Sequence, residues 1–170
     1  NVKSDSWESS PDGLRCYYFS QSTLTFLRLI RLVRKEKWDV LYINGLYSIY
    51  FSVVPLLISR IFNYPAIVAP RGMLSSGSMG TRHFRKRFYL ILARYLGFFK
   101  NAEFHATSQN ELEDIKKHFG TSIPAKYAPN LPGDVGEQSA KTTKSKGCVK
   151  LVSIARVSPE KNIDFALQLL

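Results

Sequence analysis

A strand, a tight basic turn and a helix are predicted by the stretch Leu151-Val-Ser-Ile-Ala-Arg-Val-Ser-Pro-Glu-Lys-Asn-Ile-Asp-Phe-Ala-Leu-Gln-Leu-Leu170. It begins with a short apolar run, Pro159 cannot continue a central strand, and apolar residues recur at helical spacing after Asn162, which can cap the helix. Arg156 and Lys161 flank the turn beside the helix N-terminus, where free backbone N–H groups favour an anion. The stretch predicts a site for a diphosphate, with solvated surface charge as the alternative.

The same alternation of strand and helix extends upstream. Strands are expected at residues 14–19, 40–43, 66–69, 103–106 and 125–128, and helices at 23–37, 47–62, 83–99 and 110–119. Residues 1–11 are polar and expected to be irregular, and the small polar residues at 74–81 predict a mobile loop lining a cleft. Strands that alternate with helices indicate an α/β fold with a parallel, helix-covered sheet.

A change in composition marks a domain boundary after residue 132. The segment 133–147 is rich in Ser, Thr, Lys and Gly and has almost no large apolar residue, which is typical of an exposed linker. We therefore expect one domain at 1–132, a linker at 133–147, and the first strand and helix of a second domain at 148–170.

The stretch between Asp39 and Glu103 carries positive charge only. The formal net charge is +11, from 24 Lys and Arg against 13 Asp and Glu, and no acidic residue occurs between Asp39 and Glu103. One face is therefore expected to attract an anionic partner. The uncharged run at 40–59 is long enough for a membrane span, but Asn, Gly and Pro interrupt it. A strand, a turn and a buried helix account for it equally well.

Histidines and cysteines show no metal-ligand or redox spacing. His83 and His118 fall on helices expected to be exposed, and His105 is interpreted as a satisfied interior residue of its strand rather than a catalyst. Cys16 and Cys148 each lie in or beside a predicted strand, which favours a reduced, cytoplasmic compartment.

Polar residues follow the predicted strands, where parallel sheets bind their ligands. The expected acceptor or cleft residues are Asn44, Gly45, Arg71, Gly72, Ser108 and Asn130. Turn formation and helix capping are the alternative uses of the Gly, Ser and Asn residues. Arg71 stays protonated, so it favours binding of an anionic or hydroxyl-rich acceptor over acid–base chemistry.

Cations and aromatic residues are mixed in the string Arg82-His-Phe-Arg-Lys-Arg-Phe-Tyr89. Arg82, Arg85, Lys86 and Arg87 are expected to face an anionic membrane surface. A solvated helix face and a nucleic-acid-binding surface are the alternatives.

Motifs at four places resemble retaining group-1 glycosyltransferases of the GT-B fold, particularly those that build surface polysaccharides or glycolipids in bacteria. They are Trp38-Asp-Val-Leu-Tyr-Ile-Asn-Gly-Leu-Tyr47, Ala66-Ile-Val-Ala-Pro-Arg-Gly-Met-Leu74, Phe104-His-Ala-Thr-Ser-Gln-Asn-Glu-Leu112 and Arg156-Val-Ser-Pro-Glu-Lys161. The resemblance implies a Rossmann-like parallel sheet with helices on both faces, in the acceptor-side domain, and a donor diphosphate held by Arg156 and Lys161. Many relatives carry histidine where this chain has Arg71.

The resemblance also implies an activity. Sugar would pass from a nucleotide-diphosphate sugar, the co-substrate, to a glycan or lipid-linked acceptor, with no other cofactor and no required metal. The expected location is cytoplasmic, with peripheral contact at the inner face of the plasma membrane. No residue is assigned a catalytic role.

That family has a glycine-rich loop before the region seen here and a paired-glutamate motif after it. We therefore expect an internal segment, truncated at both ends and inactive alone. The alternatives are a GT-B-fold epimerase or phosphorylase, and a non-enzymatic nucleic-acid-binding or membrane-binding domain. Nucleic acid is disfavoured because helix-turn-helix, zinc and aromatic-sheet motifs are missing from the sequence.

Overall fold

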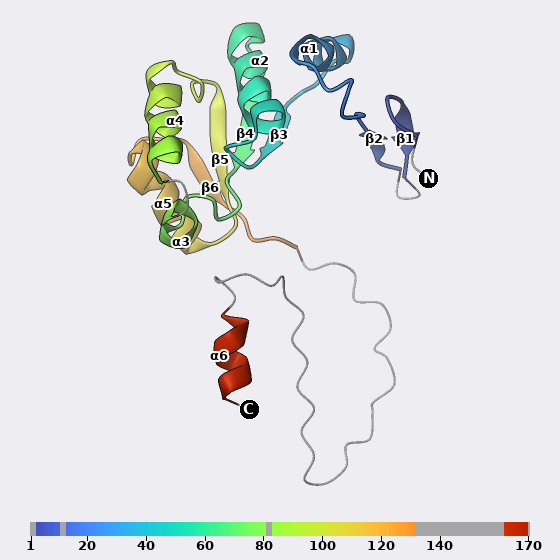
Figure 1. Ribbon diagram of the computed structural model, residues 1–170. Helices are drawn as coiled ribbons and strands as arrows, with labels where there is room; N and C mark the ends of the chain where they lie inside the picture. The colour runs from blue at the N-terminus through green and yellow to red at the C-terminus, as the bar shows by residue number, and fades with distance from the viewer. Residues whose placement is uncertain (1–2, 11–12, 81–82, 132–161, 170) are drawn as a thin grey trace, which may run out of the picture. The chain divides into compact units, whose positions relative to one another are not determined.

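The computed structural model of the chain describes residues 3–10, 13–80, 83–131 and 162–169 (Figure 1). The chain forms two compact units, Asn1–Pro129 and Asn130–Leu170. The predicted linker and the turn that carries Arg156 and Lys161 lie outside the described residues, as does Arg82.

The second unit contains helix α6, Ile163–Gln168, as the sequence predicts. Asn162 precedes this helix, but its side chain makes no capping hydrogen bond. Its backbone is left-handed (φ 46°), whereas a capping side chain normally projects from extended backbone. The predicted cap is therefore wrong.

The first unit is built on a four-stranded parallel sheet of order β3-β4-β5-β6. Its strands are β3 (Leu41–Asn44), β4 (Ala66–Ala69), β5 (Ala102–Ala106) and β6 (Ala125–Tyr127). The register places Ile43 beside Val68 and Val68 beside Phe104. The predicted α/β fold with a parallel sheet is confirmed, and this sheet is consistent with a Rossmann-like fold.

Helices connect these strands and flank the sheet. They are α1 (Phe26–Lys35), α2 (Val54–Phe62), the short α3 (Ser76–Gly80), α4 (His83–Tyr95) and α5 (Gln109–Phe119). A π-helical turn, η1 (Ile49–Val53), leads into α2. Pro55 lies in the first turn of α2, where its missing N–H costs no helical hydrogen bond. In the described ranges, every helix is too short or too polar to cross a membrane.

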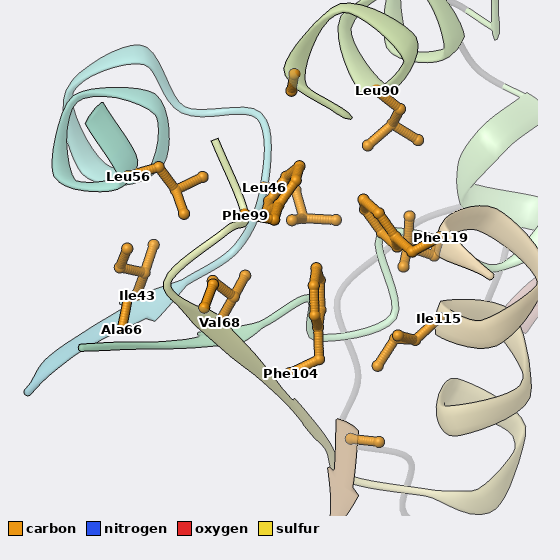
Figure 2. Packing of buried hydrophobic residues seen from close by; sticks show 14 residues of the cluster. Ile43, Leu46, Leu56, Ala66, Val68, Leu90, Phe99, Phe104, Ile115 and Phe119 are labelled. Carbon is orange, nitrogen blue, oxygen red and sulfur yellow. The ribbon is translucent and has the colours of Figure 1, made fainter. Parts of the chain in front are cut away.

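The main core lies on one face of the sheet (Figure 2). Burial alternates along β3 and β5, so Ile43 and Phe104 point into this core, whereas the residues adjacent to them on each strand point away from it. Helices α2, α4 and α5 contribute Leu56, Leu90 and Ile115. A second cluster joins α1 to α2 through Leu29, Val54 and Ile58.

The opposite face of the sheet is open in the described part of the chain. Tyr42, Asn44 and Lys126 are exposed, and Glu103 and His105 are half-buried. Glu103 and Lys126 form an ion pair of 2.9 Å across this face. The polar side chains at these alternate strand positions are compatible with contact with water.

The N-terminal region also differs from expectation. Trp7–Ser9 (β1) pairs antiparallel with Arg15–Tyr17 (β2), so the segment expected to be irregular contains a strand, and the predicted strand at 14–19 lies outside the parallel sheet. Cross-strand contact stabilises the pair: the rings of Trp7 and Tyr17 meet edge to face, and Arg15 lies over Trp7.

The described part of the segment expected to be a loop at 74–81 contains regular structure. Leu74 is buried in the main core and Ser76–Gly80 forms α3. These residues form a turn and a short helix rather than a loop, because buried Leu74 anchors the turn to the core.

Candidate functional site

The carboxyl ends of the parallel strands bring several predicted site residues to one edge of the sheet. Asn44 ends β3, the Arg71–Gly72 turn follows β4, and Ser108 follows β5. The Gly45 N–H donates to the Ala69 carbonyl at 2.7 Å, which ties the first two turns together. Of these residues, Asn44 and Arg71 are in direct contact.

A hydrogen-bonded chain runs from Asn44 to Ala128, the residue after β6. Arg71 Nε donates to Asn44 Oδ1 at 3.1 Å, and Arg71 Nη2 donates to the Tyr42 hydroxyl at 3.2 Å. Tyr42 Oη lies 2.5 Å from His105 Nδ1, and His105 Nε2 lies 2.8 Å from the Ala128 carbonyl. The four side chains and this carbonyl form the Arg71 network.

The Ala128 carbonyl sets the direction of every proton in the network. A carbonyl can only accept, so His105 Nε2 donates to it, and in the neutral imidazole Nδ1 then accepts from the Tyr42 hydroxyl. The Tyr42 oxygen then accepts from Arg71. One nitrogen of His105 contacts Tyr42 and the other contacts the Ala128 carbonyl, which favours a structural role for this histidine.

Glu111 joins the turn after β4 to the turn after β5. Its side chain is buried (5% exposed), although it is charged. One carboxylate oxygen accepts from the Gly72 N–H at 2.6 Å, and the other accepts from the N–H and the hydroxyl of Thr107, each at 2.7 Å. These bonds fix the backbone next to Arg71, whose φ of 53° is unusual for a side chain with a Cβ.

The environment of Glu111 favours its charged form. Burial alone would raise the pKa of the carboxyl, but the hydrogen bonds from Thr107 and Gly72 and the charge of Arg71 outweigh burial and lower it below the ordinary value. The carboxylate is therefore a permanent anchor of the turn rather than a proton donor.

Gly45 and Gly72 both have left-handed backbones, with φ of 90° and 74°. A Cβ on Gly45 would lie 2.9 Å from Met73 Cε, whereas a Cβ on Gly72 would meet nothing within 4 Å. Met73 also accepts a hydrogen bond from the Leu46 N–H through its sulfur. Gly45 therefore allows the two turns to approach closely, whereas Gly72 is required only for its left-handed backbone conformation.

We expect Gly45→Ala to lower the free energy of unfolding more than Gly72→Ala does. Both substitutions carry a backbone penalty of about 1–2 kcal/mol, and only the first forces Met73 to move. Urea unfolding of the two variants measures the difference. Equal losses would show that the Met73 thioether adapts without cost.

The remaining predicted site residues have separate environments. The Ser108 hydroxyl accepts from the Glu111 N–H at 3.1 Å and caps α5, which is the structural alternative for this residue. Asn130 is exposed and belongs to the second unit. The side chains of Arg85 and Arg87 are exposed on α4.

Lys86 differs from its neighbours on α4. It is half-buried, donates to the Ser78 carbonyl and lies 5.4 Å from the centre of the Tyr47 ring. Burial raises the pKa of Tyr47 to about 12. Burial and the neighbouring Tyr47 raise the pKa of Tyr89 to about 12 as well. The ring of Tyr89 packs edge to face on that of Tyr47. Lys86 therefore connects α4 to α3 instead of extending outward.

Tyr42 and Glu111 are the members of the site that the sequence did not reveal. Glu111 lies at the start of the helix expected at 110–119, and the spacing Ser108-Gln-Asn-Glu111 is that of a capping box. Its carboxylate reaches Thr107 and Gly72 instead of the cap residue. Tyr42 could have been identified only by its alternation with half-buried Leu41 and buried Ile43.

Comparison of the chain with protein-family models, with curated proteins and with solved structures gave no match. Within the described residues, His, Cys, Asp and Glu form no cluster that could hold a metal ion. At the edge, the side chains of Asn44 and Tyr42 hold the guanidinium of Arg71. A guanidinium can bind an anion or paired hydroxyl groups.

Proposed function

We propose that the chain is the acceptor-side part of a retaining glycosyltransferase of the GT-B fold, followed by the start of the donor-side domain. The observation that carries the proposal is the position of Arg71, which Asn44 and Tyr42 orient at the carboxyl edge of a parallel sheet. Ligands of such sheets bind at this edge. The four sequence motifs supply the family.

The proposed reaction transfers a sugar from a nucleotide-diphosphate donor to a glycan or lipid-linked acceptor. The bond between the anomeric carbon and the diphosphate oxygen breaks, and a bond from the acceptor oxygen to the same carbon forms. The leaving diphosphate oxygen takes the proton that the acceptor hydroxyl loses. Arg156, Lys161 and the helix N-terminus stabilise the charge that develops on the leaving diphosphate. Arg71 orients the acceptor through its hydroxyl or anionic groups.

A kinetic comparison on the protein expressed from its complete reading frame tests both roles. Arg156→Ala and Lys161→Ala are each expected to lower turnover by about 10–100-fold, the effect of one lost charge-assisted contact. Arg71→Ala is expected to raise KM for the acceptor and leave KM for the donor unchanged. Sugar transfer from labelled nucleotide sugars to extracted lipid and glycan acceptors is the measurement.

Lys144→Ala, in the predicted linker, is the matched control for the loss of a positive charge. Unfolding midpoints of all variants show whether a loss of turnover reflects loss of structure. The proposal is contradicted if no nucleotide sugar is consumed, or if Arg156→Ala and Lys161→Ala retain the turnover of the Lys144→Ala control.

A further inference from the structure

The outer side of α4 carries an exposed apolar stripe. Phe84, Phe88, Ile91 and Tyr95 recur at intervals of four, three and four residues, which places them along one side of the helix. They are 87%, 68%, 60% and 87% exposed. The opposite side of α4 packs Leu90 and Ala93 into the main core, so the helix cannot rotate to bury the stripe.

Exposed arginines lie beside the stripe. Arg85 and Arg87 project from the helix on its two flanks, while Lys86 turns inward to Ser78. The sequence of α4, His-Phe-Arg-Lys-Arg-Phe-Tyr-Leu-Ile-Leu-Ala-Arg-Tyr, contains no acidic residue. Apolar side chains in the centre and cations at the margins are typical of a helix that lies in the plane of a membrane interface.

We infer that α4 docks this protein onto an anionic lipid surface, with the stripe among the acyl chains and Arg85 and Arg87 at the lipid phosphates. Charge favours an anionic lipid surface over a second copy of the chain as the partner of this stripe. Two copies that each carry a net charge of +11 repel one another, whereas an anionic bilayer attracts the basic margins and solvates the apolar centre. Tyr95 has an apolar ring and a polar hydroxyl, which suits the boundary between the acyl chains and the lipid headgroups.

This inference is independent of sugar transfer, so it is tested by binding alone. The full chain is mixed with vesicles of phosphatidylglycerol and phosphatidylcholine in equal parts, or of phosphatidylcholine only, and sedimented. We expect binding to the mixed vesicles and little binding to the neutral ones. Raising the salt to about 1 M, where the Debye length falls to about 3 Å, is expected to weaken binding.

Matched substitutions separate the stripe from general surface hydrophobicity. Ile91→Ser is expected to weaken partitioning by about tenfold, whereas Ile61→Ser, on α2 and similarly exposed at 65%, leaves it unchanged. Arg85→Gln and Arg87→Gln are each expected to weaken it by about fivefold and to reduce its dependence on salt. Circular dichroism verifies that each variant is folded.

Three outcomes overturn the inference. The chain fails to sediment with anionic vesicles, or it binds neutral vesicles as well as anionic ones, or Ile91→Ser and Ile61→Ser behave alike. Sedimentation velocity adds a fourth: a dimer that Ile91→Ser dissociates assigns the stripe to self-association instead.

Discussion

Glu111→Gln is expected to lower the free energy of unfolding by about 3 kcal/mol at neutral pH. The buried carboxylate accepts from Gly72 and Thr107, and an amide of the same shape presents N–H groups to at least one of these donors. Glu113→Gln is the matched control on the same helix, because Glu113 is exposed. Urea unfolding of the wild type and both variants measures the effect.

The cost of Glu111→Gln depends on pH in a defined direction. The pKa of Glu111 is lower in the folded protein than in the unfolded chain, so the charged form adds stability above the unfolded value of about 4.3. That contribution is lost as the pH falls through the folded pKa. The difference between wild type and Glu111→Gln should therefore shrink in acid. A constant difference across the acid range would mean that the carboxylate charge does not support the turn.

Phe104→Ala is expected to lower the free energy of unfolding by about 3–5 kcal/mol. Phe104 is fully buried, and its ring packs against those of Phe99 and Phe119, with centroids 5.4 Å and 4.6 Å away (Figure 2). These aromatic partners come from the connection before β5 and from α5, so they cannot collapse into the vacated space without moving a strand or a helix.

Phe88→Ala provides the comparison for Phe104→Ala. The same atoms are deleted from the exposed side of α4, where the effect on unfolding should stay within about 0.5 kcal/mol. Thermal or urea unfolding distinguishes the two variants. A large loss from Phe88→Ala would mean that the stripe on α4 is covered in the folded protein, which would also contradict its contact with lipid.

The central strands could be predicted from sequence because their signals are local. Ala66–Ala69 is a short apolar run between a proline and the Arg71–Gly72 turn, and Ala102–Ala106 alternates apolar and polar residues. The start of α5 follows from Ser108 and its spacing to Glu111. In each case the residues that define the element are adjacent in the chain.

The errors arose where distant residues decide the structure. Trp7–Ser9 becomes a strand only because Arg15–Tyr17 offers it a partner, and three polar-flanked residues give no periodicity. The Arg71 network joins Tyr42 to His105, which are 63 residues apart in sequence. The common location of Asn44 and Arg71 followed from strand direction, but the contacts of Tyr42 and His105 depend on the register of the whole sheet.

The order of the strands has a consequence for synthesis on the ribosome. Each strand of the parallel sheet pairs with the strand made immediately before it, from β3 through to β6. Among the described strands of this sheet, none waits for a partner encoded much later, so each crossover can be completed soon after its second strand emerges. Translation and assembly of this sheet can therefore proceed in the same direction.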